Sequence, residues 1–264
     1  MKDIKSYAKV NIFLKIVGKR GDYHLLSSRF MRVKNLFDTI SFENGSYDQF
    51  TLEGDFGCSV EQNSIYKAYL KLVEYDQKVK TFFQTHKVVV DKKIPEFAGL
   101  GGGSSNCATF LNMVNKVCDL NISKDELAKI GSTIGADVPF FVYEYDSANV
   151  TGVGEIVEKF DENCLDIKTF TPNIKCDTGE IFRSFREKFY KNISQDEVTN
   201  LLNSKSENIL KNYQIDEVND LYQAAVDIYP TLTPQNYNLA KNSFFSGSGS
   251  SFFYINQGDN SGKI

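Results

Sequence analysis

Apolar and polar residues alternate along the first part of the chain in the manner typical of β-strands. Apolar side chains occupy every second position of segment 8–16, namely Ala8, Val10, Ile12, Leu14 and Ile16. This two-residue period indicates a strand with one buried face and one more polar face. A looser pattern of the same kind covers residues 29–43, and residues 87–90 form a third strand-like run.

Three further segments carry apolar side chains at the spacing of an amphipathic helix. They are residues 63–75, residues 107–118 and a segment that opens at Ser123 with a capping-box pattern. Ser104 and Ser105 are good N-caps and are expected to mark the start of the second helix. The third helix is expected to end near Gly135, so Asp137 is predicted to lie just beyond a helix C-terminus. A negative charge is disfavoured there and must be compensated by a cation, for which Lys9 is the candidate.

The chain is predicted to fold as an α+β protein of two domains. The stretch 143–166 is polar and contains glycine, which places the expected boundary near residue 160, between domains 1–160 and 161–264. The second half carries a strand pattern, two helical patterns and a final strand–loop–strand, at residues 167–170, 198–210, 218–228 and around 246–250.

Composition narrows the class of protein. Of the 264 residues, 41% are hydrophobic, 30 are basic (Lys or Arg) and 34 are acidic (Asp or Glu). That balance excludes a disordered chain and argues against a nucleic-acid partner, which would require a basic excess. No apolar run is long enough for a membrane span, and no signal-peptide pattern opens the sequence. We therefore expect a cytoplasmic protein without a membrane partner; its oligomeric state stays open.

The metal-ligating residue types are few and scattered. The five cysteines never form a Cys-x-x-Cys pair, and the two histidines, His24 and His86, lie far apart. This spacing favours reduced structural thiols over a disulfide framework or a zinc site. We therefore expect no metal centre made of protein ligands alone.

The strongest chemical signal is a glycine-rich segment at residues 95–105. It reads Pro95, Glu96, Phe97, Ala98, Gly99, Leu100, Gly101, Gly102, Gly103, Ser104 and Ser105. Glycines let backbone N–H groups turn inward without Cβ interference, and the helix expected next would point its unpaired N–H groups into the same space. A simple turn needs only one or two glycines, so the segment predicts a phosphate cradle, to which the serines could add hydroxyl groups for phosphate or Mg²⁺.

The sequence of this segment does not match the well-known phosphate-binding motifs of other protein classes. It lacks the Gly-Lys-Ser/Thr ending of a Walker A loop, and its glycine spacing differs from the dinucleotide-binding fingerprint. The His-Arg-Asp and Asp-Phe-Gly signatures of protein kinases are also absent from the sequence.

The segment instead resembles the central motif of the GHMP kinases, which phosphorylate small-molecule hydroxyls with ATP. Further matches follow in the family's order, at residues 8–11 (Ala-Lys-Val-Asn), 23–24, 63–65, 135–141, 152–155, 219–221 and 246–250. The resemblance implies a ribosomal S5-like N-terminal domain that binds Mg·ATP and a ferredoxin-like C-terminal domain that binds the substrate. It also implies that the loop at 246–250 lies beside the phosphate loop.

The resemblance assigns the chemistry to two residues near opposite ends of the first domain. Lys9 matches the family's catalytic lysine, and Asp137 matches the general base for the substrate hydroxyl. Asn11, two residues after Lys9 on the same strand face, is assigned to substrate binding. From the residues alone, Lys9 could be part of a solvated strand face, and Asp137 could merely accept N–H bonds from its loop.

Three other residues match positions that bind a cytosine base in one branch of the family. They are Tyr23 and His24, which offer a ring face and a hydrogen-bonding edge, and Phe182, whose match is weaker. The implied substrate is a small alcohol that carries a cytidine group. Two alternatives remain: a GHMP kinase that acts on homoserine, mevalonate or a sugar, and a nucleotide-binding regulator without turnover.

The sequence departs from the family pattern at three points. The order Gly21-Asp22 precedes Tyr23 where the family has Asp-Gly, Phe97 stands where a small residue is frequent, and Ser248 replaces a frequent threonine. None of these changes removes a group that phosphoryl transfer requires.

Overall fold

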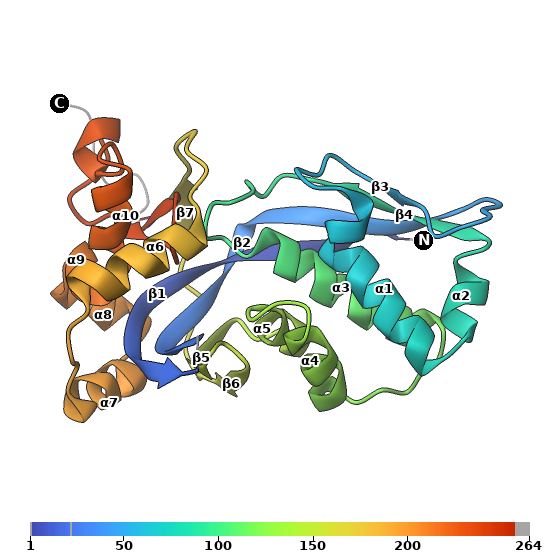
Figure 1. The fold of residues 1–264 in the computed structure, drawn as a ribbon, viewed down its shortest axis with the longest axis horizontal. Coiled ribbons are helices and arrows are strands. Elements are labelled where there is room, and N and C mark those ends of the chain that lie inside the picture. Colours follow the sequence, from blue (N-terminus) through green and yellow to red (C-terminus); the bar gives the residue numbers. More distant parts are fainter. Residues whose placement is uncertain (1, 22, 257–264) are drawn as a thin grey trace.

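The computed structural model describes residues 2–21 and 23–256, with Tyr23 described by its backbone alone. Two long antiparallel strands run through the middle of the molecule, β1 (Ile4–Arg20) and β2 (Tyr23–Asn44) (Figure 1). Helices of the first half lie at one end of this ribbon and the C-terminal elements at the other. Both strands are longer than the sequence pattern predicts, and bulges interrupt their register near Tyr7, Asn11 and Ile16.

Within the described residues, the first sheet has six strands. Five of them lie in the order β3-β4-β2-β5-β6, and the sixth, β1, pairs with β2. Its shorter strands are β3 (Leu52–Glu53), β4 (His86–Asp91), β5 (Ser147–Gly152) and β6 (Ile156–Lys159). Neighbours are antiparallel except for β3 and β4. Strands β5 and β6 lie within the polar stretch 143–166, for which the sequence pattern predicts no strands, and β6 ends just before the expected domain boundary near residue 160.

Helices of the first half enclose the main core against this sheet. They are α1 (Ser64–Tyr75), α2 (Lys78–Phe82), α3 (Gly102–Val117), α4 (Lys124–Ser132) and α5 (Val138–Tyr143). Phe42, Phe83 and Phe110 are fully buried and meet edge to face or stacked at its centre. A 3₁₀ turn, Val60–Gln62, precedes α1. None of the helices in the described residues is long and apolar enough to span a bilayer.

The C-terminal part combines a small sheet with short helices. The sheet has the order β7-β9-β8, formed by β7 (Ile167–Phe170), β8 (Phe244–Phe245) and β9 (Phe252–Ile255). The helices are α6 (Thr178–Ser184), α7 (Gln195–Asn203), α8 (Ser206–Asn212), α9 (Ile215–Val218) and α10 (Tyr222–Ile228), with a π-helical segment at Phe185–Phe189 and a 3₁₀ turn at Pro234–Tyr237. The strand pattern at 167–170 is confirmed, whereas each predicted C-terminal helix divides into two.

The two parts share strand β1. Ala8, Val10 and Ile12 pack in one apolar cluster with Phe244 and Phe253 of the small sheet. Further along β1, Leu14 and Ile16 belong to a separate cluster with residues of α6 and α10. The N-terminal strand therefore holds the C-terminal part through its apolar residues, while polar residues of the same strand remain available for a site.

Candidate functional site

The glycine-rich loop takes a conformation that only glycine adopts readily. Gly99 and Gly101 have φ of +72° and +70°, in the left-handed region. A Cβ at Gly101 would lie 2.9 Å from the Phe141 ring and 3.1 Å from Cγ of Lys9. Gly101 is also the N-cap of α3. The helix thus begins earlier than the serines suggest, and its first N–H groups belong to residues 102–104.

A cavity of about 280 Å³ opens over this loop. Its lining consists of Gly57, Cys58, Lys92 and the run from Pro95 to Ser104. Unpaired N–H groups and the positive end of the helix dipole make a helix N-terminus favourable for anions. The loop therefore offers backbone N–H donors and a helix N-terminus to an anion such as phosphate.

Lys92 lines the cradle, and its ammonium is paired with a buried carboxylate. Its ammonium lies 2.6 Å from Oδ2 of Asp38 and 3.0 Å from Oδ1 of Asn106, and it would be 3.6 Å from a Cβ at Gly102. Asp38 is completely buried and also accepts the N–H groups of Lys93 and Ile94. This network fixes the chain as it enters the loop. Sequence spacing alone does not single out Lys92 from its neighbour.

Ser105 is the member of the predicted cradle that does not face it. Its side chain is buried, its hydroxyl is 2.7 Å from that of Ser6, and its N–H donates to the Gly101 carbonyl. The expectation that both serines offer hydroxyl groups to phosphate is wrong for Ser105, because the first helical turn rotates it into the core. Ser104 lines the cavity and keeps that possibility.

Lys9 and Asp137 meet beside Gly101. The ammonium of Lys9 lies 3.3 Å from Oδ2 of Asp137, although the two residues are 128 positions apart (137 − 9). The lysine side chain is 4% exposed and the aspartate side chain 30% exposed, so only the carboxylate reaches toward solvent. The ring of Phe30 lies 4.5 Å from the ammonium and adds a cation–π contact. The predicted pairing of these residues is confirmed.

The local reason given for that pairing is wrong. Asp137 was expected beyond a helix C-terminus, where a negative charge is disfavoured, but α4 ends earlier and Asp137 is the N-cap of α5. Its side chain makes no capping bond, and the helix dipole favours its negative charge. Pro139 in the first turn of α5 suits a helix start, where its missing N–H costs nothing.

Asn11 joins the pair on the lysine side. Its Oδ1 accepts a hydrogen bond from the Lys9 ammonium at 2.7 Å, and its Nδ2 donates to Oγ of Ser28 at 2.9 Å. Both Asn11 and Ser28 are buried. Ser28 has no signal in the sequence, because its contact with Asn11 depends on how β1 and β2 pair.

The C-terminal loop closes over the phosphate loop, as the resemblance implies. Oγ of Ser246 donates to the carbonyl of Gly99 at 2.9 Å, and a Cβ at Gly247 would lie 3.4 Å from Oδ1 of Asn11. Asn219 holds this loop by donating from Nδ2 to the carbonyls of Phe245 and Gly247. Residues from both parts of the chain thus meet at Gly99 and Asn11, next to Lys9.

The candidate base-binding residues form a second cluster near the far end of the ribbon. The rings of His24 and Phe182 stack with centroids 5.1 Å apart and planes at 30°, and Phe185 meets His24 edge on. Nε2 of His24 is buried and has no partner among the described residues. Burial, assisted by Arg186 and Lys19, lowers the pKa of His24. The side chain of Tyr23 and all of Asp22 lie outside the described residues.

Phe97, one of the departures from the family pattern, stands at the wall of the cradle. Its φ is +54°, it is 55% exposed, and it lies beside Gly57. Lys175 of the C-terminal part lies 5.8 Å from its ring. Ser248, another departure, keeps its hydroxyl and bonds Thr178 at 2.8 Å.

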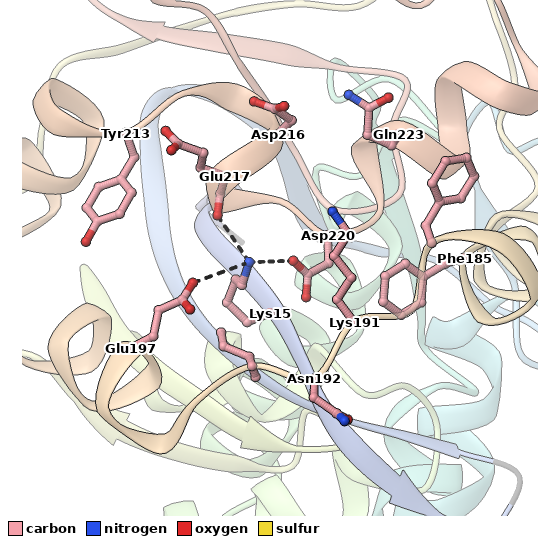
Figure 2. Close-up of a pocket in the computed structure, with 12 residues that line it drawn as sticks. Lys15, Phe185, Lys191, Asn192, Glu197, Tyr213, Asp216, Glu217, Asp220 and Gln223 are labelled. Atoms are coloured by element: carbon pink, nitrogen blue, oxygen red, sulfur yellow. Dashed lines mark hydrogen bonds and ion pairs between the residues drawn. The ribbon is translucent and has the colours of Figure 1, made fainter.

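A larger cavity of about 380 Å³ lies between the π-helical segment, α7 and α9. In Figure 2, dashed lines join the Lys15 ammonium to Asp220, Glu217 and Glu197. The ammonium lies 2.6 Å from the carboxylate of Asp220, 3.2 Å from the carbonyl of Glu217 and 4.0 Å from the carboxylate of Glu197. Asp220 also accepts the N–H of Ile16. The charge of Lys15 is therefore already paired within the protein, and these contacts connect β1 to the C-terminal helices. Within the described residues no cluster of three or more His, Cys, Asp or Glu side chains could hold a metal ion.

The fold and the cradle place the chain among the GHMP kinases. The family model described as "GHMP kinases N terminal domain" matches residues 63–145, which include the glycine loop and Asp137. The mevalonate kinase of Methanococcus jannaschii has a similar fold, with a TM-score of 0.57 over 96% of this chain and 90% of its own, at 16% identity.

More similar proteins define the family further. A 4-diphosphocytidyl-2-C-methyl-D-erythritol kinase of Sulfurimonas denitrificans is 48% identical over 98% of this chain and 99% of its own length. One from Campylobacter jejuni is 38% identical over 96% of this chain and all of its own. A crystal structure of 4-(cytidine 5'-diphospho)-2C-methyl-D-erythritol kinase has a TM-score of 0.75, 27% identity, and covers 97% of this chain and 91% of its own. The chain belongs to the family of 4-diphosphocytidyl-2-C-methyl-D-erythritol kinases.

Proposed function

We propose that this chain transfers the γ-phosphoryl group of ATP to the 2-hydroxyl of 4-diphosphocytidyl-2-C-methyl-D-erythritol, a step of the non-mevalonate route to isoprenoid precursors. The observation that carries the proposal is the Lys9–Asp137 pair at 3.3 Å, set against the glycine loop. A held triphosphate, charge neutralisation and a proton acceptor are what phosphoryl transfer to an alcohol requires. The proposal includes a cytoplasmic setting, where ATP is available.

Asp137 is the proton acceptor in this proposal, because it is the partly exposed carboxylate beside the cradle. The substrate oxygen attacks the γ-phosphorus, the bond from that phosphorus to the β–γ bridging oxygen breaks, and ADP leaves. The hydroxyl proton passes to a carboxylate oxygen of Asp137. Lys9, which donates one N–H to Asn11 and one toward Asp137, keeps further donor capacity for the transferring phosphoryl oxygens.

The cradle holds the triphosphate through N–H groups of residues 102–104 and through Lys92. Magnesium fits this arrangement as an ion bound mainly by the phosphates, since Mg²⁺ commonly keeps few protein ligands. Ser104, whose Oγ lies near Gly135 at the edge of the loop, is the hydroxyl that would contact it. When bound, the ion neutralises charge on the phosphate oxygens.

The cytosine base of the substrate binds at the His24–Phe182 cluster in this proposal, together with Tyr23. An aromatic wall provides stacking, and the buried Nε2 of His24 is a polar atom that a base edge can satisfy. Because the two rings already stack on one another, the base lies against this pair rather than between its members. Substrates without a base, such as homoserine or mevalonate, leave the cluster unused.

The experiment that tests the function is an ADP-release assay with candidate alcohols, followed by mass spectrometry of the products. We expect one added phosphate on the cytidine-bearing substrate and none on homoserine, mevalonate or galactose. Phosphorylation of one of those three instead would assign the chain to another GHMP activity. ATP binding without turnover of any alcohol would favour a nucleotide-binding regulator.

A further inference from the structure

A hydrogen-bonded chain runs inward from the reacting pair to the middle of the β1–β2 ribbon. Lys9 donates from Nζ to Oδ1 of Asn11, and Asn11 donates from Nδ2 to Oγ of Ser28. Ser28 in turn donates its hydroxyl proton to the backbone carbonyl of Phe13 at 2.5 Å. Ser28 is 0% exposed and Asn11 2% exposed, so water does not compete for these bonds.

The direction of this chain is fixed at its inner end. The carbonyl of Phe13 can only accept, and a serine hydroxyl has a single proton. Once that proton is given to Phe13, Oγ of Ser28 can only accept, so Asn11 must present its NH₂ group to Ser28. The amide oxygen of Asn11 then faces Lys9, where an ammonium needs an acceptor.

We propose that Ser28 is a positioning residue for the phosphoryl transfer: it locks the amide of Asn11, which in turn holds the Lys9 ammonium against Asp137. The inference rests on the roles proposed above for Lys9 and Asp137. Misplacing a reacting group by about 1 Å costs on the order of 100-fold in rate, so a residue that touches no substrate can control turnover in this way.

The test compares three single variants of the full-length chain. Ser28→Ala removes both bonds, and we expect kcat to fall by roughly 10-fold to 100-fold while KM for ATP stays within about 2-fold. Ser28→Thr keeps the hydroxyl and is expected to restore most of kcat. Ser27→Ala is the matched control: Ser27 is the adjacent residue, it is 1% exposed, and its Oγ has no partner among the described residues. It is expected to leave kcat unchanged.

A double variant separates positioning from general damage to the fold. If Ser28 acts through Asn11, then Asn11→Ala combined with Ser28→Ala is no slower than Asn11→Ala alone, since the amide to be oriented is already gone. Normal kcat in Ser28→Ala, or additive losses in the double variant, would overturn the inference. If Asp137→Asn is inactive while Ser28→Ala has normal kcat, only the positioning role of Ser28 is refuted. If Asp137→Asn and Asn11→Ala are both fully active, the proposed function of the site is refuted.

Discussion

Asp137 is the N-cap residue of α5, and its carboxylate lies 3.3 Å from the ammonium of Lys9 on the first strand. A positive charge and a helix N-terminus therefore stabilise the same ionised carboxylate from two sides. The arrangement places a carboxylate directly beside the glycine-rich loop, next to a lysine that offsets its negative charge.

Asp137→Asn keeps the shape of the side chain but removes the proton acceptor. We expect the variant to fold, because the side chain is partly exposed and makes no capping bond. Its kcat should fall by roughly 100-fold or more, the contribution of general-base catalysis. Steady-state kinetics with circular dichroism of the same preparation measures both. Near-normal turnover in the folded variant would contradict the assignment.

Gly101→Ala tests the geometry of the cradle. The new Cβ would approach the Phe141 ring to 2.9 Å at a residue with φ of +70°, so the loop must shift away from its cavity. We expect weaker ATP binding by calorimetry and a loss of about 1–2 kcal/mol in the free energy of unfolding from the backbone alone.

The control for this change is Gly21→Ala. Gly21 has a similar φ of +61°, yet a Cβ there meets nothing within 4 Å. It should lose a similar amount of stability and bind ATP normally. Equal loss of ATP affinity in both variants would mean that the cradle does not depend on the close approach at Gly101.

Local patterns in the sequence predict much of the first half. The alternation at residues 8–16, the helix at 63–75 and the glycine loop all have short-range causes, and the structure contains each of them. The end of α4 was predicted to within a few residues, but the short helix α5 was not predicted, although Pro139 suits the first turn of a helix. Strands β5 and β6 were also not predicted, because both mix polar and apolar residues without a clear two-residue period.

Site residues could be predicted from the sequence only where they belong to a short motif. Lys9, Asn11 and Asp137 lie in short segments that match the family, whereas Ser28 and Lys92 act through pairing of distant segments. Ser28 meets Asn11 only because β1 and β2 pair with a bulge between Asn11 and Phe13. A sequence pattern does not encode such a register shift, so contacts that depend on it emerge only from the fold.

Phe182→Ala tests the base-binding cluster. Loss of a stacking ring costs about 1–3 kcal/mol per base, so KM for the cytidine-bearing substrate should rise by roughly 10-fold to 100-fold. KM for ATP should not change, because the cluster lies outside the phosphate cradle. Phe170→Ala is the control, since Phe170 is 36% exposed and packs on Tyr237 away from His24. A parallel rise in both KM values would contradict the assignment.

His24 links stability to pH. Burial lowers its pKa in the folded protein below the ordinary value of 6.5. As pH falls through 6.5, the unfolded chain takes up a proton that the folded protein resists, so the free energy of unfolding decreases; above 6.5 this contribution is fully present. Denaturation of wild type and His24→Gln at pH 7.5 and 5.5 checks it: the advantage of wild type should shrink at the lower pH. A constant difference would show that His24 titrates alike in both states.

Arg29 connects the first sheet to the C-terminal helices from a completely buried position. Its guanidinium lies 3.2 Å from Oε1 of Glu162 and donates to Asn149 and to the carbonyl of Leu202. Burial lowers the pKa of Arg29 to about 10, although the nearby Glu162 carboxylate raises it. The group remains charged at neutral pH, and its partner Glu162 is almost as deeply buried.

Arg29→Met should therefore lower the free energy of unfolding by about 3–5 kcal/mol, because it leaves the Glu162 carboxylate buried without a counter-charge. Arg29→Met combined with Glu162→Gln should recover part of that loss, since the uncompensated charge is then gone as well. Arg20→Met is the matched control: Arg20 pairs with Glu155 at 2.6 Å but is 58% exposed, so its loss should cost less than about 1 kcal/mol. Urea denaturation of the four proteins measures these differences. A double variant less stable than Arg29→Met would mean that Glu162 stabilises the junction through Ser206, whose N–H it accepts at 2.8 Å, more than through Arg29.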